Sequence, residues 1–137
     1  MRKLTALTST LLLLILAIRP AAGCSCIPPP PPRKALADAV AVFSGKVLKV
    51  DKTKPRLYSV TFEVVRIYKG VKTAKVDVAT ATSSAACGYN FAVGQSYLVY
   101  CYGKKGLATN ICTRTTSLKS AKKDLDALGK GKVPPKK

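Results

Sequence analysis

The stretch LYSVTFEVVRIYKG (residues 57–70) decides the fold class, because apolar and polar side chains alternate along most of its length. A period of two is typical of a β-strand, since successive side chains point to opposite faces of a sheet. We therefore predict a long strand here. One of its faces carries Tyr58, Val60, Phe62 and Val64, and the other carries Ser59, Thr61 and Glu63.

Four further segments predict strands. VAVFSGKVLKV (residues 40–50) is rich in β-branched residues, and the Gly45 in its middle is expected at a bend or bulge. KVDVAT (residues 75–80) alternates again. YLVYCY (residues 97–102) is almost entirely apolar, which indicates a strand that is covered on both faces. LATNIC (residues 107–112) is predicted as a fifth, short strand.

Two helices are expected at the ends of this set of strands. A short helix is predicted over residues 34–39, directly after a polyproline run that should be extended. A second helix is predicted over residues 118–128, where apolar residues form a helical stripe. Thr116 or Ser117 is its expected N-cap, and Gly129 is its expected end.

Five strands and two short helices fit a mainly β fold, a five-stranded barrel of the oligonucleotide/oligosaccharide-binding (OB) type that is closed or partly open. A β-sandwich is the alternative that the number of strands leaves open. Residues 24–129 are enough chain for one domain with one core. The basic, proline-containing end, residues 130–137, is expected to be disordered.

Residues 1–23 predict a signal peptide that is removed before Cys24. They contain a positive start, the apolar run LLLLILAI (residues 11–18) and small residues at the cleavage site. The apolar run is too short to span a bilayer, so we expect a secreted, extracellular protein. One alternative is a retained signal anchor. Another is bacterial lipoprotein processing, which would acylate Cys24, although Ala21 stands where that signal favours leucine.

The composition argues against an enzyme. The sequence has no histidine, which excludes imidazole-based catalysis and zinc sites with a histidine ligand. It has six carboxylates, and only Asp124 and Asp126 are close together in the sequence. Two residues apart on a predicted helix, these two side chains should point to different sides. We expect no enzymatic activity and no cofactor of its own.

The charge is strongly unbalanced, with 24 lysines and arginines against six acidic residues and a formal net charge of +18. Such an excess favours polyanionic partners, namely sulfated glycans, nucleic acid or acidic membrane surfaces. The simpler interpretation, that the lysines only keep a small secreted domain in solution, stays open.

All five cysteines follow the predicted cleavage site and should oxidise after export. Five choices of unpaired cysteine and three pairings of the other four leave 5 × 3 = 15 connectivities. A thiolate zinc site is the alternative, which an oxidising compartment disfavours. The five residues are Cys24, Cys26, Cys87, Cys101 and Cys112.

The contexts of these cysteines resemble a known family. CSCIPP (residues 24–29), ALADAVAVFSGKVLKV (residues 35–50), VVRIYKG (residues 64–70), SSAACGYNFAVGQSYLVY (residues 83–100) and NICTR (residues 110–114) follow one another in that order. Together they resemble the inhibitory N-terminal, netrin-like domain of the tissue inhibitors of metalloproteinases, over nearly the whole chain after Gly23.

The resemblance implies an OB-like barrel and one connectivity. The family pairs its first cysteine with the one in the Cys-Gly block, and its third residue with the late cysteine. Carried over, this implies Cys24–Cys87 and Cys26–Cys112. Cys101 is then unpaired, either as a buried thiol or as a site of intermolecular pairing.

The resemblance also implies a function, the inhibition of zinc metalloproteinases. A catalytic zinc keeps one coordination position open, and family members fill it with the amine and the carbonyl of their first residue, here Cys24. The zinc belongs to the target protease, and any residue before Cys24 should abolish inhibition. Ser25 would enter the primary specificity pocket. The other expected cleft contacts are Cys26, Ile27, Pro28, Ser84, Ala85 and Ala86. The alternative function is a secreted basic OB-fold module that binds sulfated glycans without inhibiting proteases.

Overall fold

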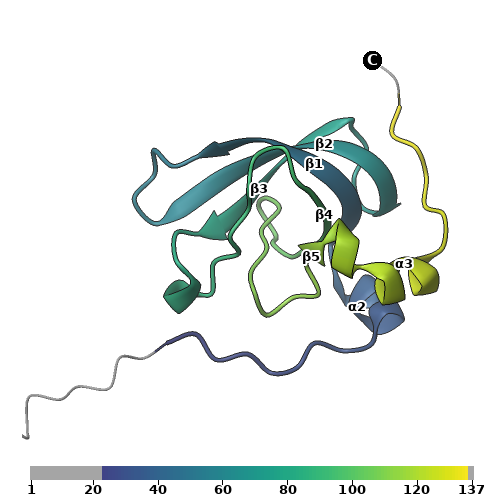
Figure 1. Ribbon diagram of the computed structural model, residues 1–137, viewed down its shortest axis with the longest axis horizontal. Coiled ribbons are helices and arrows are strands. Elements are labelled where there is room, and N and C mark those ends of the chain that lie inside the picture. Colours follow the sequence, from purple (N-terminus) through teal and green to yellow (C-terminus); the bar gives the residue numbers. More distant parts are fainter. Residues whose placement is uncertain (1–22, 136–137) are drawn as a thin grey trace, which may run out of the picture.

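The computed structural model describes residues 23–135, so the predicted signal peptide lies outside the described residues except for Gly23. The chain is mainly β, as predicted, with one antiparallel sheet in the order β3-β2-β1-β4-β5 and a helix on either side of it in the sequence (Figure 1). The elements are α2 (Pro32–Asp38), β1 (Ala41–Asp51), β2 (Leu57–Lys69), β3 (Lys75–Ala81), η1 (Ser84–Ala86), β4 (Ser96–Cys101), β5 (Thr116–Ser117), η2 (Leu118–Ser120) and α3 (Lys122–Leu128).

The sheet curls but does not close into a barrel. The segment that follows β4 lies between β4 and β3, where Ala108 forms an antiparallel bridge with Tyr102 and a parallel bridge with Ala79. These are isolated bridges and not a ladder. The prediction of a barrel is therefore correct only in a loose sense, and the sandwich alternative is wrong because a single sheet is present among residues 23–135.

The predicted fifth strand over residues 107–112 is wrong. The fifth strand is β5, only two residues long, and it begins after a turn. The cause of the turn is Asn110, whose Oδ1 accepts hydrogen bonds from the backbone N–H groups of Cys112 (2.9 Å) and Thr113 (3.1 Å). Such a local side-chain acceptor competes with strand pairing.

The alternation in β2 is confirmed by the burial of its side chains. Val60 and Phe62 are fully buried and Val64 nearly so, whereas Glu63 is exposed. β1 pairs with β2 along its length, and the register shifts between Ser44 and Gly45. A Cβ at Gly45 would lie 2.7 Å from the carbonyl oxygen of Glu63, so the bulge requires glycine there.

Two apolar clusters lie on opposite faces of the sheet, and β4 contributes to both. The inner cluster contains Phe43, Phe62 and Phe91, whose rings pack edge to face. The outer cluster lies under the helices and contains Leu98 and Tyr100 of β4. Residues Tyr97 to Cys101 are accordingly all buried, which confirms the prediction of a strand covered on both faces.

The two helices differ from the predictions mainly in their boundaries. α2 begins at Pro32, whose fixed φ and missing N–H suit the first helical turn. The polyproline run before it is extended, as Pro31 shows with φ −53° and ψ 155°. The second predicted helix is divided at Ala121 into η2 and α3, and it ends at Gly129 as expected.

The basic end is not wholly disordered. Lys132 exchanges two backbone hydrogen bonds with Ile67 in β2, at 2.7 and 2.8 Å. These bonds satisfy groups that an unattached chain would leave to water, so this part of the expected tail is ordered. Among residues 23–135 no helix has the length and apolar character needed to cross a membrane.

Candidate functional site

Two disulfides attach the N-terminal segment to the sheet. Cys24 is bonded to Cys87, directly after η1, and Cys26 to Cys112, in the turn before β5. These are the two pairings that the family resemblance implies. They are compatible with a secreted protein. Cys101 is the free cysteine among the described residues and is buried.

The disulfides bring the predicted contact residues together in what we call the N-terminal ridge, residues 24–28 and 84–86. The side chains of residues 25–28 are exposed, and Ile27 is 87% exposed. The three residues of η1 are exposed as well. Because Cys87 directly follows η1, its bond to Cys24 places η1 beside the N-terminal segment.

The turn that carries η1 is fixed by local hydrogen bonds. Ser83 Oγ accepts from the backbone N–H of Ala86 at 3.3 Å. Cys87 has a φ of 63°, in the left-handed region that non-glycine residues rarely adopt. Gly88 follows, and a Cβ there would lie 2.0 Å from the carbonyl oxygen of Ala81. Glycine at position 88 is therefore required for this turn to approach β3 closely.

The two loops that receive the disulfides are joined to each other. The backbone N–H of Ile111 donates to the carbonyl of Cys87 at 3.0 Å. Cys112 itself is positioned by its hydrogen bond to Asn110. The partner cysteines are thus held in place by hydrogen bonds of their own backbone groups as well as by the disulfides.

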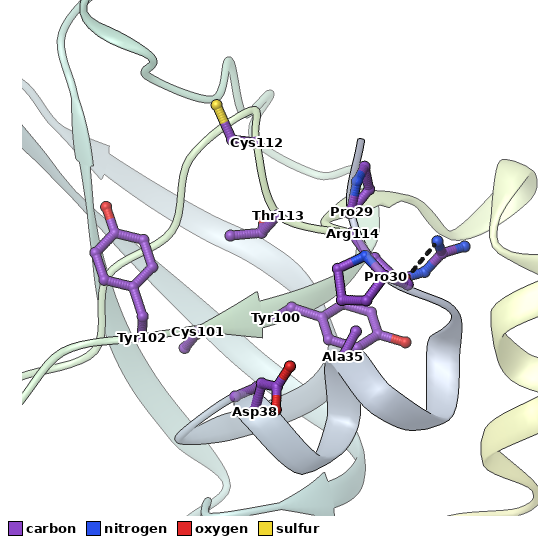
Figure 2. Close-up of a pocket in the computed structure, with 11 residues that line it drawn as sticks. Pro29, Pro30, Ala35, Asp38, Tyr100, Cys101, Tyr102, Cys112, Thr113 and Arg114 are labelled. Atoms are coloured by element: carbon purple, nitrogen blue, oxygen red, sulfur yellow. Dashed lines mark hydrogen bonds between the residues drawn. The ribbon is translucent and has the colours of Figure 1, made fainter. Parts of the chain in front are cut away.

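A second attachment, which the sequence analysis missed, holds the proline end of the segment. The Nη1 of Arg114 donates to the carbonyl of Pro30 at 3.1 Å (Figure 2). The same guanidinium donates through Nε (2.6 Å) and Nη2 (2.7 Å) to the two carboxylate oxygens of Asp124. Tyr100 Oη also donates to Asp124, at 2.8 Å. We call Arg114, Asp124 and Tyr100 the Arg114 network.

The Arg114 network is largely removed from water, since its two charged side chains are 18% (Arg114) and 7% (Asp124) exposed. Burial raises the pKa of Asp124, but hydrogen bonds from Arg114 and Tyr100 and the charge of Arg114 outweigh it, so the pKa is below its ordinary value. Burial and the hydrogen bond to Asp124 raise the pKa of Tyr100. The network therefore holds a carboxylate, a guanidinium and a neutral phenol at neutral pH. The sequence analysis did not predict this network. Its expectation that Asp124 and Asp126 point to different sides is confirmed, since Asp126 pairs with exposed Lys122.

A pocket of about 230 Å³ lies between the proline segment, α2 and the end of β4 (Figure 2). Its lining includes Pro30, Asp38 and Cys101. Asp38 is ion-paired with Lys34, and burial raises the pKa of Cys101 to about 12. A thiol with such a pKa is almost entirely protonated at neutral pH and is a poor nucleophile. The burial of Cys101 favours the buried-thiol interpretation over intermolecular pairing.

Comparison with known proteins adds no assignment. No protein-family model matches the chain, and no curated protein matches it at a significant level. The resemblance to the tissue inhibitors of metalloproteinases therefore stays a prediction from the residues themselves.

Proposed function

We propose that the chain inhibits zinc metalloproteinases with its N-terminal ridge, once processing has made Cys24 the first residue. The observation that carries the proposal is the attachment of an exposed segment at both ends. Two disulfides hold residues 24 and 26, and Arg114 holds Pro30. Little ordering is then needed when the ridge enters a cleft, and that lowers the entropic cost of binding.

The chemistry of the ridge supports chelation. A free amine at Cys24 and the carbonyl of the same residue would form a five-membered ring with a zinc ion that has an open position. An unperturbed terminal amine has a pKa of about 7.7–8, so a substantial fraction is neutral near physiological pH. In the full sequence Gly23 precedes Cys24, and its peptide bond removes that amine.

The neighbouring side chains support a position along a substrate cleft. Ser25 is small and exposed, which suits entry into a specificity pocket. Ile27 is a large apolar side chain that is 87% exposed, so covering it in a cleft would be favourable. The exposed residues of η1 lie on the same ridge and would extend the contact.

A matched pair of proteins tests the proposal. One begins at Cys24 and the other keeps Gly23, and both are oxidised and compared by circular dichroism. Against a panel of zinc endopeptidases, the form that begins at Cys24 should inhibit at least about 100-fold more strongly, because metal coordination depends on the free amine. Equal inhibition by the two forms would contradict chelation, and absence of inhibition by both, against the whole panel, would contradict the function.

A second candidate function, polyanion binding, is favoured by the turn between β1 and β2. This basic turn carries three exposed cationic side chains, and within residues 23–135 none of them is in an ion pair. Four of the six carboxylates are already paired with other cations. An unpaired cationic cluster attracts sulfated glycans. The three residues are Lys52, Lys54 and Arg56.

Heparin chromatography in a salt gradient tests this candidate. Replacing the three cations of the basic turn with glutamine should move elution to clearly lower salt, since fewer counterions are released on binding. A variant with the same net charge, altered at Lys119, Lys123 and Lys130, is the matched control. If both variants elute together, binding follows net charge, and the turn is not the site.

A further inference from the structure

A polar cleft lies between the basic turn and the loop that carries η1, at the end of β3. The turn and η1 are at the same end of the sheet (Figure 1). The volume of the cleft is about 340 Å³, near the lower limit of roughly 300–1,000 Å³ that is usual for small-molecule sites. We call it the β3–η1 cleft. Its lining includes Lys52, Tyr58, Thr82, Ser84, Tyr89 and Asn90.

The wall formed by Tyr89 is fixed by its neighbours. The ring of Tyr89 packs against those of Phe91 and Tyr97, with centroids 4.6 and 5.9 Å apart. Its backbone N–H donates to Thr80 Oγ1 at 2.8 Å. Burial raises the pKa of Tyr89, so its hydroxyl is neutral and can both donate and accept a hydrogen bond. This wall is therefore formed before a ligand arrives, which lowers the ordering cost of binding.

Lys52 supplies the charge of the cleft. Its Nζ lies 5.3 Å from the centroid of the Tyr58 ring, a cation–π contact that restricts the position of the ammonium group. The adjacent carboxylate of Asp51 lies 3.6 Å from Lys49 Nζ instead, and it accepts a hydrogen bond from the backbone N–H of Thr53. Within residues 23–135 no carboxylate lines the cleft. The charge of Lys52 is therefore available to an anionic group of a ligand.

The other polar groups of the lining are uncharged. No hydrogen bond within the described part of the chain, residues 23–135, uses the side chains of Thr82, Ser84 or Asn90. Hydroxyl and carboxamide groups both donate and accept, which suits the hydroxyl groups of a sugar. The two tyrosine rings offer apolar faces for the C–H groups of a sugar ring. One cation, several uncharged hydrogen-bonding groups and aromatic faces together match an acidic saccharide.

We propose that the β3–η1 cleft binds one acidic sugar unit of a sulfated glycan, with Lys52 against its sulfate or carboxylate group and the uncharged side chains against its hydroxyls. The inference rests on the second candidate function, polyanion binding, and gives that function a defined site. Nucleic acid suits the cleft less well. Phosphate groups are recognised best by the two-pronged donors of arginine, and Arg56 of the basic turn is not among the described residues that line the cleft.

Titration calorimetry of the oxidised protein with a heparin tetrasaccharide tests the site, because so short a chain contacts few surface cations at once. We expect one tetrasaccharide per protein. Lys52→Gln should weaken binding about tenfold or more, the effect of losing a hydrogen bond to a charged group. Lys54→Gln is the matched control. Lys54 is an exposed lysine of the same turn but does not line the cleft, so its loss should have a much smaller effect.

A second pair of variants leaves the net charge unchanged. Asn90→Ala should weaken binding about fivefold, the effect of one neutral hydrogen bond. Gln95→Ala removes an exposed carboxamide outside the cleft and should bind as the parent does. Circular dichroism checks that all four variants keep the fold of the parent.

The outcomes separate the cleft from the function on which it rests. Equal effects of the two lysine replacements, or unchanged binding by Asn90→Ala, would overturn the cleft and leave polyanion binding by the basic turn standing. Heparin chromatography that follows net charge alone would instead contradict the turn as the site. A single-stranded oligonucleotide of equal charge that competes as well as the tetrasaccharide would also overturn the proposal, because charge alone would then explain the binding.

Discussion

The N-terminal segment is attached to the domain in two different ways at its two ends. At residues 24–26 the attachment is covalent and close to the surface, through the two disulfides. At Pro30 the attachment is a hydrogen bond from Arg114, whose guanidinium is itself held by Asp124. The first attachment depends on redox state and hardly on pH. The second depends on the ionisation of Asp124 and not on redox state.

This difference indicates how the ridge keeps its shape. The covalent attachment fixes the position of residues 24 and 26, and the ionic attachment fixes the direction in which the proline segment leaves them. Loss of either one should leave a tethered but less ordered ridge, so each can be tested separately.

Removing the Cys26–Cys112 disulfide should have the largest effect on stability. Its partners are 86 residues apart, and chain-entropy arithmetic for such a loop gives about 4.6 kcal/mol. The double variant Cys26→Ser, Cys112→Ser should lose roughly that much free energy of unfolding in urea titrations. The loss should be the same at about pH 7 and about pH 5, since no group that titrates in this range is removed. A loss that differs between the two pH values would mean that the disulfide attachment also depends on pH, and would contradict the contrast between the two attachments.

Asp124→Asn should have the next largest effect, about 3 kcal/mol, because it removes the buried carboxylate and leaves the partly buried guanidinium of Arg114 without its counter-charge. Urea unfolding at neutral pH measures the change. Asp126→Asn on the same helix is the matched control, since Asp126 and its partner Lys122 are both exposed, and it should be close to the parent. Equal stability of the two variants would show that the Arg114 network contributes little.

Acidification should weaken the ionic attachment alone. The pKa of Asp124 is lower in the folded protein than its ordinary value of 3.8, so the folded state binds this proton less readily than the unfolded state. The contribution of Asp124 is therefore complete above that ordinary value and is lost as the pH falls through the lower, folded-state pKa. The parent should lose more stability than Asp124→Asn on acidification below about pH 4. Parallel pH profiles would contradict this assignment.

Tyr100→Phe should have the smallest effect of the four, about 1.5 kcal/mol, because it removes one hydrogen bond to a charged acceptor and keeps the ring. Arg114 still holds Asp124 through two bonds in this variant. Thermal unfolding of this variant and of Asp124→Asn, measured side by side, would check the order. A larger loss for Tyr100→Phe would mean that the phenol, and not the guanidinium, is the main partner of Asp124.

Several parts of the fold could be predicted because local patterns decide them. The alternation in β2 and the apolar run in β4 each follow from which faces of the strand are buried. Gly45 could be predicted at a bulge because only glycine tolerates the approach of the Glu63 carbonyl. The fifth strand could not be predicted, because the side chain of Asn110 takes the backbone donors of the following residues into a turn.

The candidate site was predictable only in part. The cysteines could be named from the sequence, whereas the contact residues of the ridge and the disulfide pairing came from a resemblance. No pattern in the sequence predicts the Arg114 network or its bond to Pro30. The residues that it joins, Tyr100, Arg114 and Asp124, are ten or more positions apart, and Pro30 is much further away. No local period brings such residues together.

By itself, the sequence determined a mainly β domain with an oxidisable Cys-Ser-Cys segment and a large positive charge. These properties depend on composition and on patterns within a few residues of each other. Only the tertiary structure decided that the two disulfides lie against each other, with Cys24 Sγ 3.7 Å from Cys112 Sγ. It also decided that the partly buried guanidinium of Arg114 holds the proline segment. Both arrangements require segments more than 80 residues apart to meet, and the curled sheet brings them together.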